Sequence, residues 1–138
     1  MTTRNTDAYL RTQILTAPPE KLQLLLYDGA IRFATQGRQK LAEGDYESSY
    51  HFLVRAQNIV LELLCGLRPE HDAALCGRMA ALYSFIYHKL LEANVNHNPE
   101  AVDDALKILS IQRGTWLELL EKLGQERSRE HTEVSANA

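Results

Sequence analysis

The sequence has little glycine, proline and cysteine, and each shortage excludes a class of protein. Seven glycines and four prolines in 138 residues exclude a collagen-like or linker-dominated chain. The two cysteines, Cys65 and Cys76, form no C-x-x-C pair, so we expect small hydrophobic residues rather than redox or metal-binding groups. The longest apolar run, around Leu24 to Tyr27, is far shorter than the roughly 18 residues that a membrane-spanning helix needs, so we expect no membrane insertion.

An excess of positive charge is also missing. The net charge is -3 and the pI is about 5.9, which argues against a nucleic-acid binder, because such proteins present a basic face to the phosphates. Residues 1–7 are polar and do not resemble a secretory signal peptide, so we expect a cytoplasmic protein. The length and the 45% hydrophobic content indicate a single domain.

Four long segments with helical periodicity follow one another, and no stretch has the alternation of a strand. We predict helices over residues 19–43, 45–66, 70–96 and 99–123, preceded by a short segment over residues 7–15. Short links between long helices make neighbours antiparallel. The predicted fold is therefore all-α: an antiparallel up-and-down four-helix bundle with an additional short N-terminal helix or segment, forming one domain over residues 1–123.

The last residues, 124–138, carry one large aliphatic side chain, Val134, among mixed charges. Such a segment buries too little apolar surface to offset the entropy lost on ordering, so we predict a disordered C-terminal tail.

Each predicted helix has more apolar surface than one face needs. The inner stripes, at spacings of three and four, include Tyr46, Tyr50, Leu75 and Trp116. Second stripes run beside them and comprise Leu24, Tyr27, Ile31 and Ala34; Phe52, Ala56, Ile59 and Leu63; Tyr83, Tyr87 and Leu91; and Ala101, Ile108 and Leu119. Two interpretations stay open: the second stripes flank a wide core, or some of them form grooves for further helices.

Catalytic and metal-binding patterns are missing from the sequence. None of the five histidines follows a glutamate by three residues, as the di-iron sites of helical bundles require. There is also no H-E-x-x-H, G-x-S-x-G or glycine-rich phosphate loop. We therefore expect a protein that is not an enzyme and needs no cofactor or metal.

Three blocks of the sequence form a recognisable pattern. The first comprises Ala8-Tyr9, Ile14, Thr16-Ala17 and Pro19-Glu20-Lys21-Leu22, running into Leu26-Tyr27-Asp28-Gly29-Ala30-Ile31. The second is Ala81-Leu82-Tyr83, followed by Leu90-Leu91-Glu92-Ala93-Asn94. The third is a helix in which Trp116 is followed by aliphatic residues. Together the blocks cover residues 8–123 and resemble the FliS family of flagellar secretion chaperones.

This resemblance implies a cytosolic export chaperone for flagellin. It implies that the disordered C-terminal segment of flagellin binds as helices in apolar grooves, which would prevent premature polymerisation and keep flagellin competent for flagellar type III export. It also allows other flagellar regulators or export components as secondary partners, and a monomer or weak dimer.

Under this resemblance the second stripes become client-binding grooves. Tyr9, Ile14 and Leu15 would plug the groove when no client is present. Leu24, Tyr27 and Ile31 would form one wall, with Asp28 offering a polar contact at its edge. The other wall would be Tyr83, Tyr87 and Leu91, with Asn94 bonding the client backbone.

Gly114 departs from the family pattern, which commonly has a polar helix former there. An interior glycine costs a helix about 1 kcal/mol relative to alanine, which predicts a more mobile end of the bundle. The alternative function is a self-associating structural or adaptor bundle, in which the second stripes pair between copies.

Overall fold

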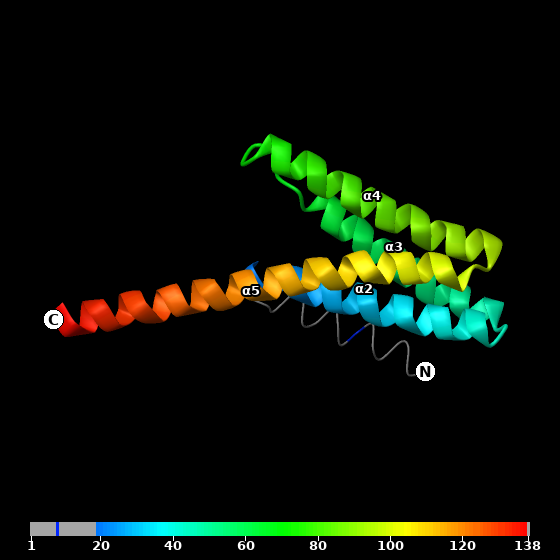
Figure 1. Ribbon diagram of the computed structural model, residues 1–138, viewed down its shortest axis with the longest axis horizontal. Helices are drawn as coiled ribbons and strands as arrows, with labels where there is room; N and C mark the ends of the chain where they lie inside the picture. Colours follow the sequence, from blue (N-terminus) through cyan, green and yellow to red (C-terminus); the bar gives the residue numbers. More distant parts are fainter. Residues whose placement is uncertain (1–7, 9–18, 138) are drawn as a thin grey trace.

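The computed structural model describes Ala8 and residues 19–137, and within these residues it contains helices and no strands. The helices are α2 (Pro19–Ala42), α3 (Tyr46–Cys65), α4 (Ala73–Asn96) and α5 (Pro99–Asn137). Each runs antiparallel to the one before it (Figure 1). The predicted N-terminal segment over residues 7–15 lies outside the described residues, apart from Ala8.

Short polar side chains determine where the helices begin. Asp45 accepts a hydrogen bond from the backbone N–H of Ser48 at the start of α3, and Asp72 accepts one from Leu75 at the start of α4. Each satisfies a backbone donor that the first turn leaves without a partner. The cap at Asp72 starts α4 three residues later than the predicted residue 70.

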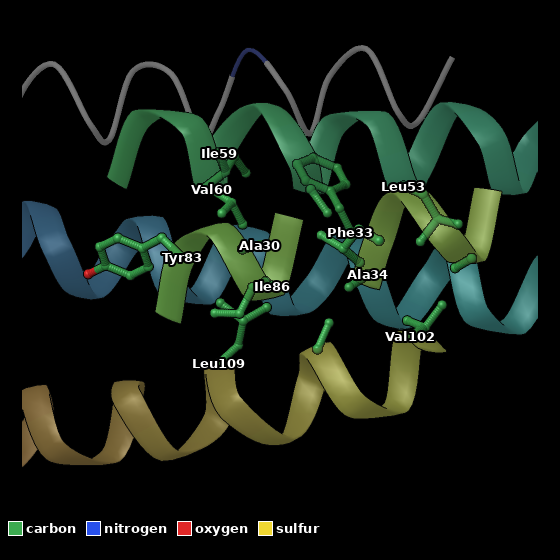
Figure 2. Packing of buried hydrophobic residues seen from close by; sticks show 14 of the residues in the cluster. Ala30, Phe33, Ala34, Leu53, Ile59, Val60, Tyr83, Ile86, Val102 and Leu109 are labelled. Carbon is green, nitrogen blue, oxygen red and sulfur yellow. The ribbon is translucent and has the colours of Figure 1, made fainter. Parts of the chain in front are cut away.

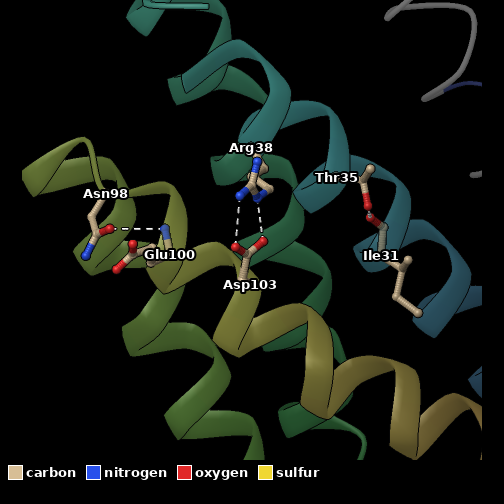
Figure 3. Close-up of polar contacts among 6 residues, drawn as sticks. All are labelled: Ile31, Thr35, Arg38, Asn98, Glu100 and Asp103. Atoms are coloured by element: carbon tan, nitrogen blue, oxygen red, sulfur yellow. Dashed lines mark hydrogen bonds and ion pairs between the residues drawn. The ribbon is translucent and has the colours of Figure 1, made fainter. Parts of the chain in front are cut away.

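Two tight links set the antiparallel order. Gly44, with φ of 78°, ends the turn between α2 and α3, and this left-handed conformation costs glycine little. His97, with φ of 52°, ends α4 in the same conformation. The next residue, Asn98, accepts a hydrogen bond from the backbone N–H of Glu100 and so caps the first turn of α5 (Figure 3).

The helices form a ring in which each packs against its two neighbours in sequence order, and α5 closes the ring against α2. Helices α2 and α4 therefore lie across the bundle from one another, as do α3 and α5. This arrangement confirms the predicted up-and-down four-helix bundle.

The core runs along the bundle axis and draws on both predicted stripes of each helix (Figure 2). Several second-stripe residues lie fully inside it: Tyr27, Ala34, Ala56, Leu63, Tyr83 and Ala101. Conversely, Tyr46, Tyr50 and Leu75 were predicted to be inside and are exposed. In α3 the buried face lies between the two predicted stripes: Leu53 and Val60 were predicted to be inside and are buried, whereas the buried Ser49 was on neither stripe.

The C-terminal segment differs from the predicted disordered tail. In the structure α5 continues through it to Asn137 and projects beyond the bundle (Figure 1). The side chains of residues 121–136 are all exposed, so no packing supports this part of the helix. Its glutamate, arginine, glutamine and lysine residues have high helix propensity, and they extend a helix already nucleated in the bundle.

Candidate functional site

The residues predicted to form the first groove wall lie on α2, where Asp28 shows which neighbour they face. Asp28 forms an ion pair with Arg113 of α5. Leu24 and Ile31 lie four residues before and three residues after Asp28, so they share its face of the helix and follow the line where α2 meets α5. Both are half-buried, and Ile31 packs against the core.

We call this line the α2–α5 seam. A second ion pair, between Arg38 and Asp103, crosses it ten residues later in α2 and ten residues earlier in the antiparallel α5 (Figure 3). The Arg38 guanidinium, through its hydrogen bonds, lowers the pKa of the Asp103 carboxyl, although partial burial opposes the shift. The same pair raises the pKa of Arg38, so both groups stay charged at neutral pH.

The residues predicted to form the second wall lie on α4 and face a different neighbour. Asn94 donates a hydrogen bond to Gln57 of α3, with 3.4 Å between Nδ2 and Oε1. Leu91 and Tyr87, three and seven residues before Asn94, follow the line where α3 meets α4, which we call the α3–α4 seam. The Leu91 side chain is 41% exposed, whereas Tyr87 is half-buried against the core.

The structure therefore does not bring the two predicted walls together. The α2–α5 and α3–α4 seams lie on opposite sides of the ring. Asp28 and Asn94, which are predicted to contact the client, are each bonded to a neighbouring helix in the structure.

Two residues of the predicted walls do meet, and they meet inside the bundle. The hydroxyl oxygens of Tyr27 and Tyr83 lie 2.6 Å apart, and both side chains are buried. Gln23 donates a further hydrogen bond to Tyr83, at 2.9 Å. Burial, reinforced by the hydrogen bond with Tyr27, raises the pKa of Tyr83 well above its ordinary value, so the cluster is uncharged. For these two tyrosines the prediction of a groove wall is replaced by a place in the core.

The remaining predicted residues are three near the N-terminus and Trp116. Tyr9, Ile14 and Leu15 lie outside the described residues. Trp116, predicted to be in the core, is half-buried at its edge, and its indole N–H has no hydrogen-bond partner among the described residues.

Exposed apolar residues that the sequence prediction missed lie where α4 meets α5. Phe85 is 43% exposed and Ile111 is 56% exposed. The Lys89 ammonium lies 5.6 Å from the centre of the Phe85 ring and also pairs with Asp104 of α5, which places Phe85 beside α5. Neither Phe85 nor Ile111 fell on a predicted stripe, and a search for apolar residues outside both stripes would have found them.

Two features are absent from the part of the chain that the structure describes. Among residues 8 and 19–137, no three His, Cys, Asp or Glu side chains gather as they would around a metal ion. No described helix combines the length and the apolar character needed to cross a bilayer.

Comparison with known proteins identifies the family. A family model described as "Flagellar protein FliS" matches residues 1–123. The chain belongs to the FliS family. The flagellar secretion chaperone FliS of Bacillus subtilis (strain 168) is 28% identical over 120 residues, covering 87% of this chain and 89% of the relative. That of Salmonella typhimurium (strain LT2) is 26% identical and covers 87% and 90%.

A solved structure supports the fold independently. A bacterial flagellar chaperone has a TM-score of 0.70 to this chain and 19% sequence identity, covering 88% of this chain and 99% of its own. The family model confirms the resemblance to the FliS family. The relatives are named as chaperones, which is a non-enzymatic role and agrees with the prediction that this chain is not an enzyme.

Proposed function

We propose that this FliS-family chain is a cytoplasmic export chaperone that binds the C-terminal segment of flagellin as helices. Binding prevents premature polymerisation and keeps flagellin competent for flagellar type III export. The observation that carries this proposal is the presence of incompletely covered apolar residues on opposite sides of one bundle: Leu24 and Ile31 on the α2–α5 seam, and Tyr87 and Leu91 on the α3–α4 seam.

Two opposite seams favour a client that wraps around the bundle. A disordered segment can follow both sides, whereas a rigid globular partner would reach only one. Apolar burial along the seams offsets the entropy that the client loses when it becomes helical, so the interface can be large and still reversible.

The first test is calorimetric titration of the purified chain with a peptide from the C-terminal end of the same organism's flagellin. We expect saturable binding near one to one, a negative heat-capacity change and a gain of helix in circular dichroism, because coupled folding onto an apolar surface produces all three. A folded chain that binds no peptide at high micromolar concentration would contradict the proposal.

A single substitution then tests the proposed site. Leu91→Ser removes an exposed apolar side chain from the α3–α4 seam, and we expect peptide affinity to fall about fivefold. Val134→Ser is the matched control, since Val134 is 68% exposed on the part of α5 that projects beyond the bundle. Equal losses in both variants would mean that the seam is not the binding surface.

Self-association is the second candidate function, and the exposed Phe85 and Ile111 favour it. Paired copies would cover these side chains where α4 meets α5. Sedimentation at several concentrations separates the candidates: a monomer supports the chaperone proposal, and an obligate dimer that Ile111→Ser dissociates supports self-association.

A further inference from the structure

The bundle is packed unevenly along its length. In α4 the residues from Tyr83 to Ala93 supply four fully buried side chains, whereas Ala73–Leu82 supply none. Along α5 the last buried side chain is Leu109. Helices α4 and α5 lie close at their shared turn and diverge toward the start of α4 (Figure 1).

Two glycines occupy the loosely packed end. Gly77 lies in α4 and Gly114 in α5, both within helices, and a Cβ atom built on either would meet no atom within 4 Å. Lack of space therefore does not require glycine at these positions. Both glycines lower the helix propensity of this end of the bundle, where few buried side chains are present to offset the loss of stability.

A buried polar cluster marks the boundary between the two parts. Tyr83 is the first fully buried residue of α4, and its hydroxyl is hydrogen-bonded to Tyr27 and Gln23 of α2. This is a connection across the bundle, between helices that are not neighbours in the ring. A hydroxyl that leaves such a partner while it stays buried loses a full hydrogen bond, so the cluster holds α4 firmly at this residue.

From these observations we propose that Ala73–Leu82 is a gate that unfolds locally from the bundle while the rest stays packed. Tyr83, held by Tyr27 and Gln23, is the residue at which the opening stops. Opening uncovers the half-buried apolar side chains at this end, Met79 of α4 and Trp116 of α5 among them. The gate itself is independent of the proposed function; its use, admitting a client helix to these residues, rests on that function.

Hydrogen exchange of the free, full-length chain, followed by mass spectrometry, tests the gate because exchange reports local opening. In the unmodified chain we expect amides of Ala73–Leu82 to exchange at least tenfold faster than those of residues 86–93. Tyr83→Phe should let the opening extend past residue 83, and we expect amides of residues 83–85 to exchange about fivefold faster, the value of one hydrogen bond, with little change in Ala73–Leu82. Tyr87→Phe is the control, because Tyr87 lies one turn further along α4 and takes no part in the cluster.

The opposite change should close the gate. Gly77→Ala should slow exchange in Ala73–Leu82 about threefold to fivefold and leave residues 101–109 unchanged. Gln23→Ala provides a milder version of Tyr83→Phe if that variant does not fold. Uniform exchange along α4 in the unmodified chain, or an equal acceleration in all helices of Tyr83→Phe, would overturn the proposal.

The client arm of the experiment is separate. With the flagellin peptide, Gly77→Ala should slow association about threefold and change dissociation little, because fewer molecules are open when they meet the peptide. An unchanged association rate would overturn the role of the gate in client entry. Absence of peptide binding in every variant, with the exchange pattern as expected, would instead contradict the proposed function and leave the gate in place.

Discussion

Gly37 lies on α2 where the helix packs tightly against Leu53 of α3. A Cβ atom on it would lie 2.7 Å from Cγ and Cδ2 of Leu53, a side chain that is itself completely buried. Because Leu53 has no free space into which it can move, the approach of the two helices depends on the missing side chain.

Gly37→Ala should therefore destabilise the bundle. We expect a steric cost of about 1–3 kcal/mol, only partly offset by the gain in helix propensity. Gly114→Ala is the matched control, since its Cβ meets nothing and only the propensity gain remains. Urea denaturation of both variants checks the expectation, and a Gly37→Ala chain as stable as the original would show that α3 shifts at no cost.

The ion pair between Arg38 and Asp103 makes stability depend on acid. The pKa of the Asp103 carboxyl is lower in the folded chain than its ordinary value, so this pair contributes stability above about pH 4. That contribution is lost as the pH falls through the lowered pKa. Asp45 has a lowered pKa as well, because it accepts hydrogen bonds from Ser48 at the start of α3, and it acts in the same direction.

Asp103→Asn isolates this effect. The variant should be less stable than the original chain at pH 7, and the difference should narrow as the pH is lowered from 5 to 2. Both side chains are substantially exposed, so added salt should also narrow the difference. Denaturation curves at several pH values measure it, and a difference independent of pH would show that the pair adds nothing through charge.

Among the elements, α5 shows most clearly what local sequence can and cannot predict. Its start was predictable, because Asn98 and Pro99 form a local start signal that needs no tertiary contact. Its end was not, because the prediction judged residues 124–138 by their lack of apolar surface, whereas the structure extends a nucleated helix through residues of high propensity.

Truncation of α5 after Leu123 tests how far the extension matters. Since residues 124–136 are exposed, we expect the free energy of unfolding of the bundle to change by less than about 0.5 kcal/mol. The far-ultraviolet circular dichroism signal should fall, because helical residues are removed. A clearly lower midpoint of denaturation would mean that the extension packs against the bundle.

For the whole molecule, the architecture followed from the sequence but the rotation of each helix did not. Periodicity and caps are local, so they located four helices and their antiparallel order. Two adjacent apolar stripes on each helix left several rotations equally plausible, and only packing chose the one that buries Ala56 and Leu63 of α3 and exposes Tyr50. The pairing of Tyr27 with Tyr83 was equally inaccessible, because each hydroxyl finds its partner only in the assembled bundle.

The rotation of each helix about its own axis determines which apolar side chains remain partly exposed for a client. Leu24 on the α2–α5 seam and Leu91 on the α3–α4 seam lie on opposite sides of the ring. If the flagellin segment wraps around the bundle, Leu24→Ser and Leu91→Ser should each weaken binding about fivefold. Their effects should also add, giving about 25-fold in the double variant, because distant sites contribute independently.

Calorimetry of the two single variants and the double variant measures this additivity, with Val134→Ser as the unaffected control. A client that occupies one seam would leave one of the single variants with unchanged affinity. That result would contradict the wrapped arrangement while keeping the chain a chaperone. Additive losses would place the client on both sides of the bundle, which is the arrangement that the distribution of partly covered apolar residues favours.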